Sequence, residues 1–241
     1  MALMPSVSFI VAAYNVDKTL ENAVYILLDK TKKWRIEDYE ILIVVDSKTS
    51  DSTLQIGQKL AKSNPKIIVI NRPENKSLGL ILINSLKLVK KEYFCLCSGK
   101  DPFWPKSLDC IFPLLGQADI IACYVGNPKD RPWFRRLASW INVALVNMLF
   151  GLNIPYYHFY FCRTSLTKKV PISSPSYSSM AEILVWLLKS GATFVLAPFY
   201  LKPQPKQSSA IKFKNIIGIL SAYTKLFLKI RILGQKIDLN P

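Results

Sequence analysis

The chain has few of the residue types that most often hold metal ions or act as general acids and bases. Its 241 residues include one histidine, His158, and 16 acidic residues against 32 lysines and arginines. The cysteines show no Cys-x-x-Cys spacing, which argues against a structural zinc site. We expect reduced thiols in the core, as is usual in the cytosol, at Cys95, Cys97, Cys110, Cys123 and Cys162.

Long apolar runs are also missing. No stretch reaches the roughly 18–20 uninterrupted apolar residues that a membrane-spanning helix needs. The nearest, Leu137–Leu152, is shorter and contains Asn142 and Asn147. The N-terminus lacks the basic lead of a secretory signal. We therefore expect a cytoplasmic protein that does not span the membrane but lies at the periphery of its cytoplasmic face.

Acidic residues are nearly missing from the second half of the chain. Residues 1–120 hold 16 basic and 13 acidic residues, whereas residues 121–241 hold 16 and 3, a net charge of +13. Such an imbalance predicts an anionic partner, either a phospholipid surface, a phosphorylated substrate or nucleic acid. The basic–aromatic sheet motifs of common RNA-binding modules are absent, so we expect no nucleic acid.

Apolar runs of strand length alternate with stretches of helical spacing. This order predicts an α/β fold with a mainly parallel central sheet and helices on both faces. The expected strands are Val7–Ala13, Ile41–Val45, Lys66–Ile70, Tyr93–Cys97, Asp119–Tyr124, Tyr156–Cys162 and Thr193–Ala197. The expected helices are Thr19–Leu28, Thr53–Ser63, Asn75–Val89, Trp133–Phe150, Met180–Lys189 and Ile211–Ile232, while Ser98–Leu108 is expected to be an irregular loop because of Pro102 and Pro105.

The pattern also predicts how the chain is organised. We expect one domain over residues 1–209, with a nucleotide-binding half (1–120) and an acceptor half (121–209). Residues 210–241 would form a basic amphipathic helix and tail. The apolar stripe of this helix, through Ile216, Leu220, Tyr223, Phe227 and Ile230, suits either a membrane surface or a contact with the domain's own core.

One apolar run ends abruptly in a carboxylate. Ile41–Val45 is followed by Asp46, by several hydroxyl side chains and by Asp51. Ligands of open α/β sheets bind at the carboxyl ends of the strands. We therefore place Asp46 in a nucleotide site, where a carboxylate accepts hydrogen bonds from a base or a ribose. Asp51 either lies in the same site or caps the helix that follows.

Several segments together resemble family 2 glycosyltransferases with the GT-A fold. They are AAYN at Ala12–Asn15, VVDSKTSDST at Val44–Thr53, NKSLGL at Asn75–Leu80, and the later stretches that begin RPWFRR and AEILVW. The resemblance is greatest to the dolichol-phosphate mannose synthase branch, which transfers a sugar from a nucleotide to a polyprenyl phosphate. It implies nucleotide-binding roles for Ala12, Tyr14, Asn15, Asp46, Gly79 and Ser98.

The chain departs from this family where the family's Asp-x-Asp motif would hold Mg²⁺ or Mn²⁺. Ser98 and Lys100 stand in place of the two acids, and Asp101 is displaced by one position. Three alternatives follow. Lys100 replaces the metal with an ammonium, Asp101 still holds a metal together with the diphosphate, or catalysis is lost and the protein only binds.

A polyprenyl phosphate needs no general base, because its attacking oxygen is already ionised. It does need positive charge and an apolar surface, and Arg131, Arg135 and Arg136 beside Trp133 and Phe134 supply both. The resemblance adds Lys202, Lys206 and Ser208, where the family places basic residues and a serine on the phosphates. The simpler alternative is that these charges are solvated. Glu182, the one acid between Asp130 and Asp238, is expected to pair with Arg131 or Arg163 or to face the sugar, and is a catalytic candidate with Lys100 and Asp101.

Overall fold

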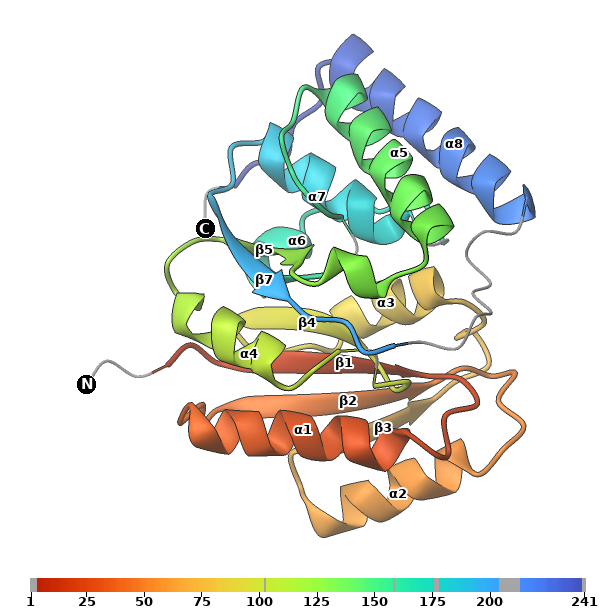
Figure 1. Cartoon of the computed structure of the whole chain (residues 1–241), viewed down its shortest axis with the longest axis vertical. Helices are drawn as coiled ribbons and strands as arrows, with labels where there is room; N and C mark the ends of the chain where they lie inside the picture. Colours follow the sequence, from red (N-terminus) through yellow and green to blue (C-terminus); the bar gives the residue numbers. More distant parts are fainter. Residues whose placement is uncertain (1–3, 102, 158, 176–177, 204–212, 240–241) are drawn as a thin grey trace.

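The computed structural model describes residues 4–101, 103–157, 159–175, 178–203 and 213–239, with side chains left out for 213–216. His158 and Ser208 therefore lie outside the described residues. Within these ranges the chain forms a seven-stranded sheet in the order β3-β2-β1-β4-β6-β5-β7 (Figure 1). The strands are β1 (Val7–Ala13), β2 (Tyr39–Val45), β3 (Ile67–Asn71), β4 (Tyr93–Ser98), β5 (Ile120–Val125), β6 (Tyr160–Arg163) and β7 (Phe194–Phe199).

The sheet is mainly parallel, as the sequence predicts. β1 pairs in parallel with both β2 and β4, and β2 pairs in parallel with β3. β6 runs antiparallel between β4 and β5, and β5 is parallel to β7. The strands of the parallel half therefore end at one edge, and their connecting loops meet there.

Helices cover both faces, because alternate residues of each buried strand point to opposite sides. Phe9 and Val11 of β1 face a core formed with α1 (Leu20–Lys33), α2 (Thr53–Ser63) and α4 (Lys106–Ile111). Ile10 faces the opposite core. That core contains α3 (Leu78–Leu86), α5 (Trp133–Phe150), α7 (Ser179–Lys189) and α8 (Phe213–Phe227), while the short α6 (Thr164–Thr167) follows β6.

Several expected boundaries were wrong for identifiable reasons. α3 begins at Leu78, not Asn75, because the Ser77 hydroxyl accepts the Leu80 N–H as a helix cap. The expected loop 98–108 already turns into α4 at Lys106, since a proline just before a helix is compatible with its start. β6 starts at Tyr160 instead of Tyr156.

The cysteines lie as expected, with one exception. Cys95, Cys97, Cys123 and Cys162 are buried free thiols, while Cys110 is partly exposed. Cys95 and Cys97 share a face, with their sulfurs 3.7 Å apart. Burial raises the pKa of the Cys95 and Cys123 thiols well above their ordinary value, so both stay protonated.

The C-terminal helix packs much of its apolar stripe against the domain's own core. α8 continues into a π-helical turn, Leu228–Ile232, and lies beside α5 (Figure 1). Much of its apolar stripe packs inward: Tyr223 is buried with its hydroxyl on Asn142, and the Phe227 ring meets Phe150 at 6.4 Å. Leu220 remains exposed. Across the described residues, no helix is both long and apolar enough to cross a membrane.

Candidate active site

The carboxyl ends of three central strands meet at one edge of the sheet. Ala12 of β1 lies opposite Val44 of β2 and Ser98 of β4. The Asp46 N–H donates to the Ala13 carbonyl, and the Gly99 N–H donates to the Ala12 carbonyl, each at 2.9 Å. The structure therefore brings together three predicted nucleotide-site positions, Ala12, Asp46 and Ser98.

Asp46 and Asn15 shape the loops at this edge. Asp46 is 8% exposed, and its carboxylate accepts the Lys48 N–H at 2.9 Å. Asn15 adopts a positive φ of 48°, and its side-chain oxygen accepts the Ser50 N–H. Asn15 therefore joins two loops, whereas Tyr14 projects into solvent with about half of its side chain exposed.

Asp51 caps α2. Its two carboxylate oxygens accept the backbone N–H groups of Thr53, at 3.0 Å, and of Asp17, at 3.2 Å. Burial by itself would raise the pKa of this carboxyl, but the hydrogen bonds from Thr53 and Asp17 outweigh it and lower the pKa. Of the two roles considered from the sequence, this geometry gives Asp51 the capping one.

The segment before α3 reaches the same edge. The Asn75 carbonyl accepts the Ser47 N–H at 2.9 Å, so this segment lies against the loop that carries Asp46. Gly79 is buried in the first turn of α3, two residues after the cap residue Ser77. The structure thus places Gly79 behind the loop rather than on its surface.

The loop from Ser98 to Asp101 is held tightly against the β1–α1 connection. The Thr19 hydroxyl donates to the Gly99 carbonyl at 2.7 Å. A Cβ at Gly99 would lie 3.0 Å from Val16 Cγ2 and 3.3 Å from the Ala12 carbonyl oxygen. A side chain at this position would therefore require Val16 and the Ala12 backbone to shift by a few tenths of an ångström.

Asp101 forms an ion pair that was not predicted from the sequence. It has a positive φ of 50°, and its carboxylate accepts hydrogen bonds from the Asn22 amide and the Lys202 ammonium. The pair is largely shielded, with Asp101 12% and Lys202 21% exposed at the side chain. Asp101 and Lys202 are 101 positions apart, so no local pattern pointed to this contact.

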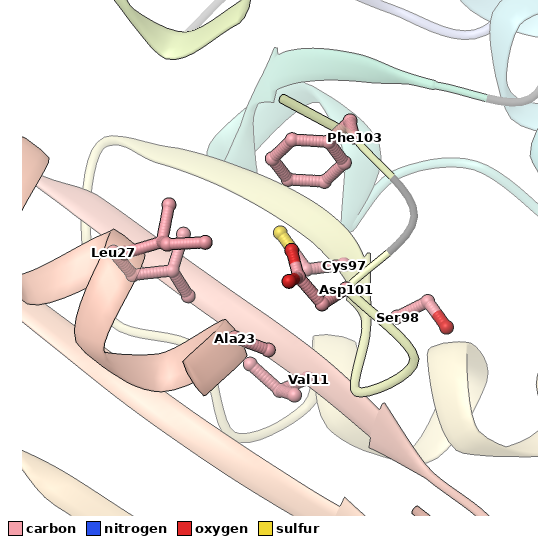
Figure 2. Close-up of a pocket in the computed structure, with 8 residues that line it drawn as sticks. Val11, Ala23, Leu27, Cys97, Ser98, Asp101 and Phe103 are labelled. Atoms are coloured by element: carbon pink, nitrogen blue, oxygen red, sulfur yellow. The ribbon is translucent and has the colours of Figure 1, made fainter. Parts of the chain in front are cut away.

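Figure 2 shows the Asp101 carboxylate beside Cys97, while Ser98 points in another direction. The surrounding pocket is lined mostly by apolar groups, among them Ala23, Leu27 and Phe103. Its volume is about 10 Å³, room for about one water molecule. This pocket is therefore not where a sugar or nucleotide binds.

The segment that carries Lys202 is anchored from two sides. Asn127 holds Leu201 with two hydrogen bonds of 2.8 Å, one to its N–H and one to its carbonyl. Leu201 also forms an antiparallel bridge with Phe103. The backbone of Lys202 is thus fixed next to the Ser98–Asp101 loop and to Asn127, which lies shortly before α5.

The residues present do not fit a divalent metal ion. Mg²⁺ and Mn²⁺ prefer several carboxylate, carbonyl or water oxygens. At the end of β4 the chain offers one carboxylate, Asp101, which is already paired with an ammonium, and Lys100 adds a second positive charge. Throughout the described residues, no group of three or more His, Cys, Asp or Glu side chains is arranged to hold a metal.

The expected acceptor residues lie around the start of α5. The Arg131 guanidinium donates to the Ser139 hydroxyl at 3.1 Å, and Arg135 is half-buried on the first turn. Lys202, another of the expected acceptor residues, forms an ion pair with Asp101 instead.

Glu182 does not make the ion pair that we expected. It is 3% exposed, and its oxygens accept the backbone N–H groups of Ser173 and Ser174 and the Ser173 hydroxyl. Arg163 instead pairs with Glu92 and Asp119. These contacts are those of a residue that anchors a loop.

The mainly parallel sheet with helices on both faces defines a GT-A type of α/β domain, the class used by glycosyltransferases. The sequence pattern of glycosyl transferase family 2 matches residues 8–178. The chain therefore belongs to glycosyl transferase family 2, a family of enzymes. A comparison with curated protein sequences found no match.

Solved structures show the same fold at low sequence identity. Glucosyl-3-phosphoglycerate synthase from Mycobacterium tuberculosis, in complex with uridine diphosphate, is 14% identical with a TM-score of 0.65; the match covers 91% of this chain and 80% of that one. Mannosyl-3-phosphoglycerate synthase from Rubrobacter xylanophilus is 13% identical with a TM-score of 0.68, covering 95% and 75%. TarS 1–349 from S. aureus, in complex with UDP-GlcNAc, is 17% identical with a TM-score of 0.58, covering 92% and 66%.

Proposed function

We propose that this protein transfers a sugar from a nucleotide sugar to a polyprenyl phosphate at the cytoplasmic face of a membrane. Membership of glycosyl transferase family 2 supports the donor half of this proposal. Similar structures of glucosyl-3-phosphoglycerate synthase contain uridine diphosphate with Mn²⁺ or Mg²⁺, and one of them also contains phosphoglyceric acid, not a lipid. The acceptor half rests on this chain's own surface.

The outward face of α5 carries the acceptor proposal. Trp133, Trp140 and Met148 are 72%, 67% and 72% exposed, although large apolar side chains on a helix normally face the core. Further exposed apolar residues extend the face, namely Phe134, Leu137 and Ile141. A contiguous apolar surface of this kind marks a binding site for a protein, a lipid chain or a membrane.

Basic residues accompany this face, although one exposed acidic residue, Asp130, lies three residues before Trp133. Arg136 is exposed on the first turn of α5, and α5 itself contains no acidic residue. The basic turn at the end of α8, with Lys229 and Arg231, follows a helix that packs on α5. Exposed tryptophans with arginines suit the headgroup layer of an anionic membrane.

This face begins close to the donor edge. Asn127 lies six residues before Trp133 in the chain, and its side chain binds Leu201, the neighbour of Lys202. Arg131 lies between Asn127 and Trp133 along the chain, and Arg135 follows on the first turn of α5. We therefore assign them to the acceptor phosphate, with the apolar face available to the polyprenyl chain; Ser208 stays a prediction outside the described residues.

The chemistry requires positioning more than acid–base catalysis. A phosphate oxygen of the acceptor attacks C1 of the sugar, and the bond from C1 to the nucleoside diphosphate breaks with its electron pair leaving on the diphosphate oxygen. No proton is transferred, because the attacking oxygen is already ionised. Cations must then stabilise the charge that develops on the leaving diphosphate.

The test combines transfer with membrane binding. The full-length protein is incubated with labelled UDP-, GDP- and dTDP-sugars and a polyprenyl phosphate in detergent, and label in the organic phase is measured. The protein is also floated with vesicles of anionic phospholipid. We expect transfer from one donor, and loss of flotation in Trp133→Ser/Trp140→Ser.

Tyr25→Ser serves as the control, since Tyr25 is a half-exposed aromatic residue on α1, on the other face of the sheet. Equal flotation of both variants and the unaltered protein would contradict the surface assignment. Absence of transfer from every donor would contradict the acceptor proposal.

A second candidate function is a binding module that keeps the nucleotide-sugar pocket without transferring the sugar. The loss of both acids at Ser98 and Lys100 favours it. Thermal stabilisation by a nucleotide sugar, without transfer to any polyprenyl phosphate, would support this candidate over the enzyme.

A further inference from the structure

We propose that Asp101 positions the Lys202 ammonium, and that this ammonium takes the place of a divalent metal ion beside the donor diphosphate. The inference rests on the donor half of the proposed function. It assigns to Asp101 a role different from that of a metal ligand, and to Lys202 a role on the donor rather than on the acceptor.

The charge of Asp101 is already balanced. Its Oδ2 atom accepts both the Asn22 amide and the Lys202 ammonium, and the pair is mostly shielded from water. Low exposure strengthens an ion pair, because less solvent screens the two charges. A divalent ion bound to the Asp101 carboxylate would lie next to the Lys202 ammonium, and the two positive charges would repel each other.

The other side chains of the Ser98–Asp101 loop supply no second carboxylate for a metal ion. Ser98 offers a neutral hydroxyl oxygen, which accepts the Lys100 N–H at 3.2 Å, and the Lys100 side chain is exposed and cationic. The described part of the chain gives the Lys100 ammonium no carboxylate partner. The end of β4 therefore presents two ammonium groups and one occupied carboxylate.

Lys202 is preorganised for an anion. Leu201 is fixed by Asn127 and Phe103, and the neighbouring Tyr200 carbonyl accepts the Trp104 N–H at 2.7 Å. The ammonium lies 5.6 Å from the centre of the Trp104 ring. An ammonium has three N–H donors, so the bond to Asp101 leaves two for phosphate oxygens without moving the side chain.

The first experiment measures metal dependence of binding, not of turnover. Calorimetric titrations with UDP, GDP and CDP are made with the full chain in Mn²⁺ and in EDTA. We expect the dissociation constant of the nucleotide that binds to differ by less than about threefold between the two, since the diphosphate's charge is met by ammonium groups. Binding that is lost in EDTA and restored by Mn²⁺ would overturn the inference.

The second experiment removes the positive charge of Lys202 and keeps an unbranched side chain. Lys202→Met should weaken the nucleoside diphosphate about 10- to 100-fold, the range for a lost hydrogen bond to a charged group. It should leave the affinity for the nucleoside without phosphates unchanged, which a merely structural defect would not do. Lys202→Arg should recover part of the loss, and Lys59→Met on α2 controls for net charge.

Asp101→Asn distinguishes the two roles of the carboxylate. We expect it to weaken diphosphate binding about three- to tenfold, because the ammonium is held less firmly, with the same result in Mn²⁺ and in EDTA. A loss of Mn²⁺-stimulated binding in this variant would instead identify a metal ligand. If no nucleotide binds the unaltered protein under any condition, the proposed function fails as well; Mn²⁺-dependent binding would overturn this inference alone.

Discussion

Replacing Asp51 tests whether this carboxylate builds the fold or binds the ligand. Asp51 accepts the N–H groups of Thr53 and Asp17 and so ties the start of α2 to the β1–α1 connection. Asp51→Ala removes both hydrogen bonds and leaves the helix without its cap. Asp51→Asn keeps one acceptor oxygen, but its amide group then faces an N–H donor.

The expected loss of stability follows from these two contacts. A lost helix cap costs about 0.5–2 kcal/mol, and a hydrogen bond to a charged group contributes about 1.5–3 kcal/mol. Because Asp51 is partly exposed and the bond to Asp17 is 3.2 Å long, we take the lower ends. We expect Asp51→Ala to lower the free energy of unfolding by about 2–3 kcal/mol and Asp51→Asn by about 1–2 kcal/mol.

Urea unfolding at pH 7, followed by far-ultraviolet circular dichroism, measures the difference. Ser52→Ala is the control, since its hydroxyl makes no capping bond and the change should cost less than about 0.5 kcal/mol. The pKa of Asp51 is lowered in the folded protein, so its contribution is present above the unfolded-state pKa of about 3.9 and fades as the pH falls below it. Asp51→Ala with the stability of Ser52→Ala, but with weakened nucleotide binding, would refute the capping role.

Three further predictions concern other contacts of the site and its scaffold. Burial would raise the pKa of Asp109, but hydrogen bonds from Lys30, Trp34 and Lys33 lower it to about 2. Asp109→Asn should therefore lower the free energy of unfolding by about 2 kcal/mol at pH 7, and by progressively less from pH 4 to pH 2. Acid-unfolding curves measure this difference. Gly99→Ala should shift the Ser98–Asp101 loop, cost about 1–3 kcal/mol and weaken nucleotide binding, as calorimetry would show. Glu182→Gln should lower the free energy of unfolding by about 2–4 kcal/mol and leave the nucleotide dissociation constant unchanged. Unchanged stability with a changed nucleotide dissociation constant would instead support a catalytic role for Glu182.

The parts of the fold that the sequence predicted well are those set by local pattern. The apolar run Val7–Ala13 and the helical stretch Trp133–Phe150 have the expected bounds, because each ends at residues that stop its element. α5 ends at Gly151, which takes the left-handed conformation with φ 61° that side chains disfavour. α3 began later than expected because a serine cap, not the apolar spacing, sets its first residue.

The candidate site likewise has a part that local sequence predicts and a part that it does not. Ala12, Asp46 and Ser98 could be placed together from the sequence, because parallel strands deliver their ends to one edge. The Asp101–Lys202 pair could not, since nothing near either residue specifies a partner 101 positions away. Likewise the spacing of α5 showed an apolar helix, but only the packing shows that Trp133 and Trp140 remain uncovered.

The clasp of Asn127 on Leu201 has a consequence for the order and strength of substrate binding. It joins the entrance of α5 to the segment that carries Lys202 through two hydrogen bonds of 2.8 Å, so neither segment shifts without the other. If the start of α5 holds the acceptor and Lys202 holds the donor, as proposed above, a shift of α5 on acceptor binding would be passed to Lys202 through these two bonds. Linkage would then require a bound donor to alter the affinity for the acceptor by the same factor.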